Sequence, residues 1–141
     1  MGKLLLFLAM AGTFGGAGAA GFCERMPMDP EVPAGLAGSY EVLGKDPVTG
    51  ASYAGTLVLE GGKDGYVLTR TVEGQALDGE AWIERCTADR IMALLVRYHA
   101  QPAIEMFCAL GGDGDNYYRI TCRSRQGEDP PSGLEAWFQG R

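Results

Sequence analysis

Apolar and polar side chains alternate along most of the chain after residue 38, with the two-residue period that is typical of β-strands. Between residues 118 and 123, for example, Tyr118, Ile120 and Cys122 alternate with polar residues. Such alternation places the apolar side chains on one face of a strand and the polar ones on the other. The pattern therefore predicts strands that bury one face and expose the other, as antiparallel sheets do.

Eight such runs are separated by short segments rich in Gly, Asp and Asn, which are residues that favour turns. The predicted strands span residues 39–43, 52–60, 65–73, 77–86, 90–99, 103–110, 116–123 and 134–139. Eight strands with short connections predict an all-β protein that closes into an antiparallel up-and-down barrel, which removes exposed sheet edges. Gly55 and Gly79 in the strand centres favour this barrel over the alternative, a two-sheet β-sandwich.

One of these runs also has a helical interpretation. Ile91, Leu94, Leu95 and Tyr98 have helical spacing, so a helix over residues 88–98 is the alternative there. We prefer the strand, because three consecutive apolar residues from 94 to 96 also fit a well-covered strand.

Residues 1–20 have the features of a cleaved signal peptide. Lys3 provides a positive start, residues 4–11 are apolar, and the small residues that follow include an A-x-A cleavage box. A retained membrane anchor is one alternative, although glycines weaken it as a spanning helix. A lipoprotein with Cys23 as the lipidated residue is another, but the bulky Phe22 precedes that cysteine. We therefore expect a periplasmic or secreted protein without stable membrane insertion after cleavage.

The mature chain divides into two parts. Residues 21–37, which contain three prolines, predict an extended lead-in, and residues 38–141 predict a single barrel domain. The whole chain has 18 acidic and 12 basic residues. Loss of Lys3 with the signal peptide leaves 18 acidic and 11 basic residues, a net charge near −7. This charge argues against nucleic acid and anionic lipid as partners and leaves a small-molecule ligand or a basic protein.

All four cysteines follow the predicted signal peptide, and an even number in an oxidising compartment predicts two disulfides. Of the three ways to pair them, we favour Cys108–Cys122, because both flank one turn, and consequently Cys23–Cys86. A simple hairpin centred on residues 113–115 does not place Cys108 opposite Cys122. This bridge therefore requires a bulge or an offset turn.

Two phrases in the sequence resemble the strands of lipocalin-like, or calycin-like, barrels. The first is Gly38-Ser39-Tyr40-Glu41-Val42 followed by Tyr53-Ala54-Gly55-Thr56-Leu57, and the second is Gly65-Tyr66-Val67-Leu68-Thr69-Arg70 leading to Leu77-Asp78-Gly79-Glu80-Ala81. The resemblance covers roughly residues 38–139 and implies an architecture rather than an activity.

The chain also departs from this pattern. Lipocalins begin with Gly-x-Trp, where this chain has Gly38-Ser39-Tyr40, and the basic residue that covers this aromatic would be Arg123 or Arg125. Residues 49–53 loosely resemble the signature loop of exported bacterial lysozyme inhibitors, which are also small disulfide-bonded barrels.

The sequence contains no motif that indicates catalysis or a cofactor. His99 is the only histidine, and no nucleophile elbow, zinc-binding pair or phosphate loop is present. Residues 111–116 resemble the start of a calcium loop, but the acidic run ends at once, so we interpret them as a turn. Glu80, Glu84 and Glu105 form no pair that the sequence can distinguish from chance. We expect no enzyme activity, no metal and no cofactor.

Aromatic residues in the predicted strands are the better clue to function. A barrel of eight strands can enclose a small cavity, in which Tyr and Trp side chains offer apolar walls with a polar tip. The candidate ligand-binding residues are Tyr66, Arg70, Trp82, Arg97 and Tyr98, with Arg70 as the anchor for an anionic group. The sequence thus predicts a non-catalytic protein that binds a small apolar or amphipathic ligand. The alternative is a protein-binding module, such as an inhibitor of a lysozyme-type hydrolase.

Overall fold

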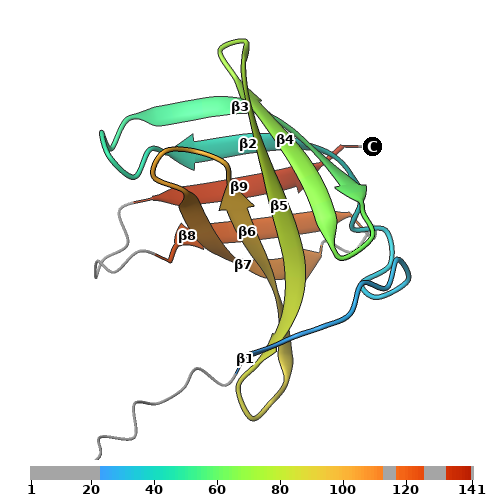
Figure 1. Ribbon diagram of the computed structural model, residues 1–141. Helices are drawn as coiled ribbons and strands as arrows, with labels where there is room; N and C mark the ends of the chain where they lie inside the picture. The colour runs from blue at the N-terminus through green and yellow to red at the C-terminus, as the bar shows by residue number, and fades with distance from the viewer. Residues whose placement is uncertain (1–22, 113–116, 126–132, 141) are drawn as a thin grey trace, which may run out of the picture.

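The computed structural model describes residues 23–112, 117–125 and 133–140, and these residues form strands and connections without any helix (Figure 1). The strands are β1 (Cys23–Arg25), β2 (Gly38–Lys45), β3 (Ser52–Gly61), β4 (Tyr66–Val72), β5 (Gln75–Cys86), β6 (Ile91–Tyr98), β7 (Ile104–Gly112), β8 (Tyr118–Ser124) and β9 (Leu134–Gln139). The predicted signal peptide lies outside the described residues.

Strands β2 to β9 each pair antiparallel with the next strand in the sequence, and β9 pairs back with β2. This last pairing closes the sheet into an eight-stranded up-and-down barrel, so the predicted fold class is confirmed and the sandwich alternative is wrong. Residues 91–98 form a strand, so the helix alternative is wrong as well. The predicted boundaries of the barrel strands agree with the observed ones within two residues.

The sequence does not predict β1, which lies in the expected extended lead-in. This strand has only three residues, too few to show an alternation of apolar and polar side chains. It pairs with residues 84–86 of β5, whereas β4 pairs with residues 75–81 of the same strand. Thus β5 runs on past the end of β4, and β1 takes the place beside it that β4 leaves (Figure 1).

The interior of the barrel contains one continuous cluster of buried side chains from every barrel strand. Trp137 is fully buried, and its ring contacts that of Tyr40 edge-on at 5.9 Å between centroids. Aromatic pairs in this geometry add to the stabilisation that burial itself provides. The inward residues of the barrel therefore pack against one another across its axis.

Residues 26–37, which we call the N-terminal strap, cross one end of the barrel between β1 and β2 (Figure 1). The strap begins with a hydrogen bond from the Met26 backbone N to the Ile83 carbonyl, at 2.8 Å. Further along, the Tyr118 hydroxyl donates to the Ala34 carbonyl and the Gln139 amide donates to the Gly35 carbonyl, at 2.9 and 2.8 Å. The side chain of Leu36 is only 1% exposed. The strap therefore closes this end of the barrel, which we call the strap end.

The two disulfides join Cys23 to Cys86 and Cys108 to Cys122, which are the pairs expected from the sequence. Of the two expected ways to bring Cys108 opposite Cys122, a bulge or an offset turn, the structure has the offset turn. Gly112 pairs with Tyr118 and the register continues unbroken to Cys108 opposite Cys122. The midpoint of the hairpin is therefore residue 115, one residue later than the sequence suggested, and this shift alone brings the two cysteines into register.

We predict that Leu36→Ala lowers the free energy of unfolding by about 3 kcal/mol, because it removes a buried side chain that fills the strap end. Leu43→Ala is the matched control, since Leu43 is 55% exposed, and it should cost less than about 1 kcal/mol. Urea unfolding followed by tryptophan fluorescence measures both. Equal losses for the two variants would show that the strap is not packed as described.

Candidate functional site

The five predicted ligand-binding residues do not converge on one site. Tyr66, Arg70 and Tyr98 point into the barrel, whereas Trp82 and Arg97 lie on its outer face. Because neighbouring residues of a strand point to opposite faces, Arg97 and Tyr98 cannot both line the interior. The candidates therefore form an inner group and an outer group on opposite faces of the barrel wall.

The inner group is organised by Glu135, a carboxylate that is only 2% exposed. Its Oε1 accepts hydrogen bonds from the Tyr53 hydroxyl and from Nη1 of Arg70. Its Oε2 accepts from the Tyr98 hydroxyl and from Nε1 of Trp137, both at 2.7 Å. These five residues, which we call the Glu135 network, come from β3, β4, β6 and β9. A buried carboxylate requires such partners, since an unpaired one would cost several kcal/mol.

Arg70 is the one cation of this network. Its guanidinium lies 4.4 Å from the ring centroid of Tyr98 and 5.1 Å from that of Tyr53, so two aromatic faces support the charge. The sequence analysis predicts that Arg70 binds an anionic group of a ligand. In the structure its anion is Glu135 of the same chain.

The tyrosines of the network are held in their neutral, hydrogen-bond-donating form. Burial, followed by the nearby charge of Glu135, raises the pKa of both Tyr53 and Tyr98 well above the usual value near 10. Both hydroxyls therefore keep their protons throughout the physiological range and remain donors to Glu135.

The outer group forms a second, smaller apolar cluster on the outside of β5, β6 and β7. It contains Trp82, Leu95 and Phe107, together with Cys86 and Ala93, and we call it the outer aromatic cluster. The guanidinium groups of Arg25 and Arg97 lie 4.7 and 5.3 Å from the centroid of Trp82. Arginine stems cover apolar surface while their charges stay in water, so this cluster is largely covered by the chain itself.

The candidate carboxylates lie beside this cluster. Arg97 donates from Nη2 to Glu105 at 2.7 Å and from Nη1 to Glu80 at 3.2 Å, while Trp82 Nε1 donates to Glu84 at 2.9 Å. Glu80 and Glu105 thus share one guanidinium. Their shared contact with Arg97 therefore accounts for the proximity of these two carboxylates.

Several other sequence candidates lie away from both groups. His99 is exposed, and its backbone N donates to the Asp78 carbonyl at the end of β6. Arg123 lies on the outer face, 5.5 Å from the ring of Phe107, and Arg125 is exposed. The inward Tyr40 instead donates its hydroxyl to the backbone of the strap. Most of the candidate calcium loop, residues 113–116, lies outside the described residues.

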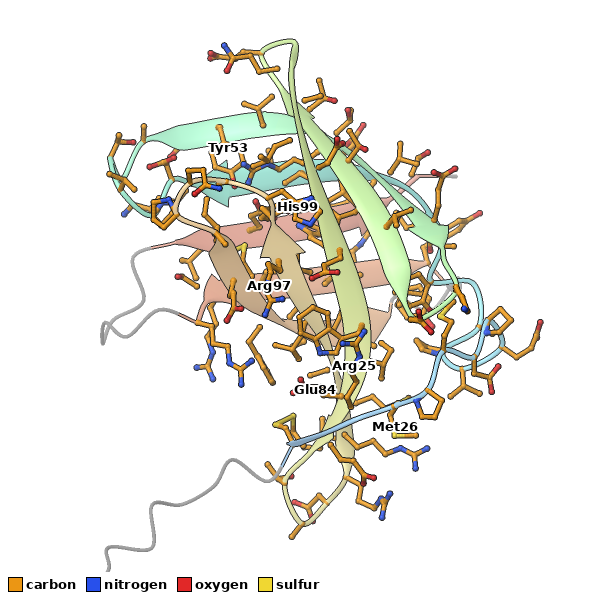
Figure 2. The ribbon with its side chains drawn as sticks, viewed as in Figure 1. Arg25, Met26, Tyr53, Glu84, Arg97 and His99 are labelled. Carbon is orange, nitrogen blue, oxygen red and sulfur yellow. A yellow bond between two sulfur atoms is a disulfide. The ribbon has the colours of Figure 1, made fainter. Side chains whose placement is uncertain are left out.

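A pocket that the sequence did not indicate lies at the strap end. It has a volume of about 230 Å³ and is lined by Met26, Pro27, Asp29, Val32, Ile83, Arg85 and Met92. One wall belongs to the N-terminal strap and the other to β5 and β6, and we call it the end pocket. Met26, in the strap, and Tyr53, in the Glu135 network, lie toward opposite ends of the barrel (Figure 2). The sequence did not predict the end pocket, because the residues of its two walls are separated by more than 50 positions along the chain. Only the path of the strap brings these walls together.

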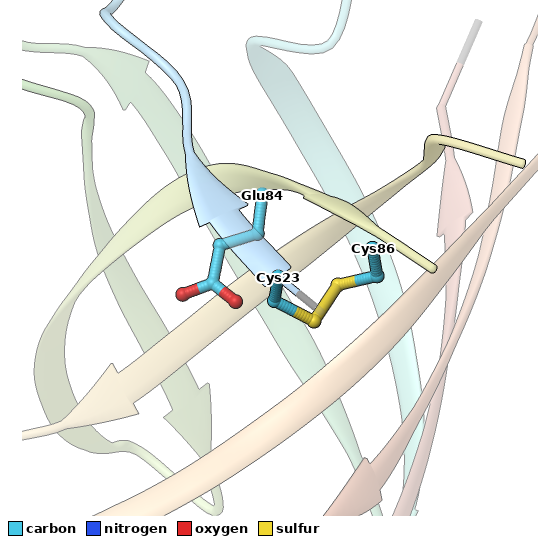
Figure 3. A group of neighbouring side chains, drawn as sticks. All are labelled: Cys23, Glu84 and Cys86. Carbon is cyan, nitrogen blue, oxygen red and sulfur yellow. A yellow bond between two sulfur atoms is a disulfide. The ribbon is translucent and has the colours of Figure 1, made fainter. Parts of the chain in front are cut away.

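Cys23, Glu84 and Cys86 bring three potential metal-ligand atoms within 4.8 Å of one another (Figure 3). The two sulfur atoms are joined in a disulfide, and metal ions bind thiolates rather than disulfide sulfurs. In this oxidation state the group is therefore a covalent bridge with a neighbouring carboxylate.

Comparison with protein-family models, with curated proteins and with solved structures found no match to this chain. Among the described residues, no helix is long and apolar enough to cross a membrane.

We predict that Glu135→Gln lowers the free energy of unfolding by about 3–5 kcal/mol, since it leaves the buried guanidinium of Arg70 without its counter-charge. Glu41→Gln, on the exposed face of β2, is the matched control and should change stability by less than about 0.5 kcal/mol. Adding Arg70→Gln to Glu135→Gln should cost less than the sum of the two single changes, because the pair acts as a unit. Strict additivity in chemical denaturation would contradict the network.

We also predict a loss of stability in alkali. The folded pKa values of Tyr53 and Tyr98 lie above the unfolded value near 10, so their contribution is complete below about pH 10 and is lost as the pH rises further. Tyrosinate absorbance and far-ultraviolet circular dichroism, followed together against pH, measure this. The absorbance of these two tyrosines should rise only as the barrel unfolds. Complete tyrosine ionisation near pH 10 in an intact barrel would contradict the burial of both hydroxyls.

Proposed function

We propose that the protein is a non-catalytic binding protein that holds a small apolar or amphipathic ligand in the end pocket. The observation that carries this proposal is the composition of the pocket. Met26 and Val32 of the strap, Ile83 of β5 and Met92 of β6 provide apolar walls, and Arg85 and Asp29 supply one charge of each sign beside them. Apolar walls with a few polar groups are typical of small-molecule sites.

The packing of the barrel directs the ligand to its end rather than to its centre. Inward side chains from all eight barrel strands contact one another in a single cluster. The polar donors at the other end, from Tyr53, Arg70, Tyr98 and Trp137, are directed at Glu135. An anionic ligand group at that position would have to displace a carboxylate of the chain.

The size of the end pocket limits the ligand class. An engineered protein cavity of about 150 Å³ binds benzene, so the pocket of 230 Å³ suits two fused rings or a short alkyl chain, with a further ring or a charged group at its opening to the solvent. Methionine side chains are flexible and polarisable and adapt to different apolar shapes. Arg85 can pair with an anionic group of the ligand, and Asp29 can accept a hydrogen bond from a donor group.

Two disulfides within one chain indicate an oxidising environment outside the cytoplasm. We further propose that the protein acts in the periplasm or after secretion, in agreement with the signal peptide that its sequence predicts. A binding protein in that location meets small molecules from the surroundings of the cell.

Native mass spectrometry of protein purified gently from the periplasm or the medium tests this function. The proposal expects a mass four hydrogens below that of the fully reduced chain, with a small molecule retained on part of the protein. Protein without any adduct, even after incubation with 8-anilinonaphthalene-1-sulfonate as an amphipathic probe, would contradict it.

A pair of variants tests the position of the site. Met92→Trp places a larger side chain in the end pocket and should weaken binding of the same probe at least about tenfold, which corresponds to about 1.4 kcal/mol. Ile91→Trp is the matched control, because Ile91 is 59% exposed and points to the opposite face of β6. Probe fluorescence measures both affinities. Equal affinities would place any binding elsewhere.

A second candidate function is supported by the loop between β2 and β3. The side chain of Asp46 accepts hydrogen bonds from the backbone N of Thr49 and of Val48, at 2.7 and 2.8 Å, and these bonds lower the pKa of its carboxyl group. They also hold the loop in one conformation, with Val48 89% exposed at its tip. A preformed loop on an acidic protein suits insertion into a basic partner, such as a lysozyme-type hydrolase.

A lysozyme assay tests this second candidate. If it is correct, micromolar protein inhibits the hydrolase in a salt-dependent way, and Val48→Asp weakens inhibition at least about tenfold. Leu43→Asp, exposed on another part of the barrel, should leave inhibition unchanged. Absence of inhibition at micromolar concentration would remove this candidate.

A further inference from the structure

The two disulfides differ sharply in their accessibility. Cys108 and Cys122 are both fully buried inside the barrel. Cys23 is exposed, although its partner Cys86 is buried in the outer aromatic cluster. Thiol–disulfide exchange requires a thiolate to reach a sulfur atom, so exposed bridges react with reductants far faster than buried ones.

The exposed disulfide also occupies a particular place in the chain. It joins β1, immediately before the N-terminal strap, to the end of β5, across 63 residues. The non-covalent contacts of this region lie near the surface: the three exposed residues of β1 pair with β5, and Met26 donates a backbone hydrogen bond to Ile83. Arg25 also donates to the Asp64 carbonyl at 3.0 Å and lies over the ring of Trp82, while the partly buried Met26 and Met28 pack against the core. The bridge is therefore the strongest attachment of the first half of the strap.

The second half of the strap is attached independently. Leu36 is buried, and the backbones of Ala34 and Gly35 accept hydrogen bonds from Tyr118 and Gln139. Release of the Cys23–Cys86 bridge would thus leave residues 23–32 held only by the weaker non-covalent contacts of Arg25, Met26 and Met28, while residues 34–37 stay in place. The weakly held part includes Met26, which lines the end pocket.

We propose that the Cys23–Cys86 disulfide is a thiol-exchange site, at which a dithiol reductant of the thioredoxin class opens the N-terminal strap. The reductant thiolate attacks the exposed Sγ of Cys23, the bond between the two sulfurs breaks, and Cys86 leaves as a thiolate that takes up a proton. The second thiol of the reductant then displaces Cys23 from the mixed disulfide. The protein gains two thiols and the dithiol becomes a disulfide. The reverse exchange with a disulfide oxidant of the same class, which is itself reduced to a dithiol, restores the bridge.

Glu84 tunes the rate of this exchange. Its carboxylate lies beside the two sulfur atoms (Figure 3), within 4.8 Å of both. It also accepts a hydrogen bond from Nε1 of Trp82. A negative charge at this distance repels the incoming thiolate and disfavours the thiolate that leaves. Glu84 is therefore a positioning residue that protects the bridge against weak reductants.

The first experiment measures which cysteines react. The intact protein is incubated with dithiothreitol under native conditions, and free thiols are alkylated and located by mass spectrometry. Cys23 and Cys86 should become labelled at least about 100-fold faster than Cys108 and Cys122, which must wait for the barrel to open. Equal rates for both bridges, or the absence of native-state reduction, would overturn the proposal.

The second experiment measures the opening of the strap itself. After selective reduction, amide hydrogens of residues 24–32 should exchange at least about tenfold faster, while those of β2 and β8 remain protected. The Cys23→Ser/Cys86→Ser variant should show the same pattern without any reductant. Unchanged exchange of the strap in both samples would overturn the proposal, whatever the thiol labelling shows.

Glu84→Gln distinguishes an electrostatic role from mere contact. It should speed reduction of the Cys23–Cys86 bridge by about threefold at low salt and less at high salt. Glu24→Gln is the matched control, because Glu24 is the exposed neighbour of Cys23 and points to the other side of β1. Equal rates for the two variants would remove the role of Glu84.

Regulation of binding in the end pocket is the one part of this inference that rests on the proposed function. Reduction should weaken binding of 8-anilinonaphthalene-1-sulfonate, because one wall of the end pocket leaves with the strap. If the strap opens but neither form binds the probe, the exchange site stands and the proposed function fails. If the oxidised form binds the probe and reduction leaves the strap closed, the proposed function stands and the exchange site fails.

Discussion

Glu135 is a carboxylate inside a closed barrel, and it can remain there only because four donors surround it. Tyr53, Arg70, Tyr98 and Trp137 reach it from three further strands and from its own. The free energy of burying a charge is far larger than the stabilisation from any single hydrogen bond, so all four donors, including the charged Arg70, must contact Glu135 together. The network therefore ties together strands that lie far apart around the barrel. It also fills the position where a barrel of this kind would otherwise offer polar groups to a ligand.

This constraint explains why the opposite end of the barrel differs. There the N-terminal strap covers the opening with Leu36 and with a few backbone hydrogen bonds, rather than with a charge network. Between the strap and β5 the packing leaves the end pocket, lined by methionines that can adapt to a guest. The strap is attached at its beginning by an exposed disulfide. A buried charge network thus stabilises one end of the barrel, while the other end is closed by a segment that a disulfide attaches at its beginning.

The alternation of apolar residues predicted the strands well, because a two-residue period is imposed wherever a strand has one buried face. The alternation did not predict β1 or the path of the strap, because these segments have no hydrophobic period and tertiary contacts determine where they lie. The alternation also indicates the wrong inward face for β9. The apolar residues Leu134, Ala136 and Phe138 would be expected to face the interior, but Glu135 and Trp137 do so instead. Burial of the large Trp137 ring and the four hydrogen bonds to Glu135 stabilise this orientation more than burial of the three apolar residues would stabilise the opposite one.

Only some of the candidate site residues point into the barrel as the sequence predicted. Arg70 and Tyr98 were correctly expected to point inward, but the partner of Arg70 is 65 residues away in the sequence, and no local signal indicates it. Trp82 and Arg97 were assigned to the interior because aromatic and basic residues suggest binding. They instead cover the outside of the barrel, where arginine stems shield apolar rings. The end pocket depends on the path of a non-periodic segment, which only the folded chain defines.

The central claim is that binding takes place at the strap end and not in the barrel interior. Methyl-labelled methionine gives the most direct measurement, since Met26 and Met92 line the end pocket whereas Met106 is buried among the inward side chains. In a titration with 8-anilinonaphthalene-1-sulfonate followed by nuclear magnetic resonance, the methyl signals of Met26 and Met92 should shift together, and that of Met106 should stay in place. A dominant shift of Met106, with Met26 and Met92 unchanged, would contradict the account.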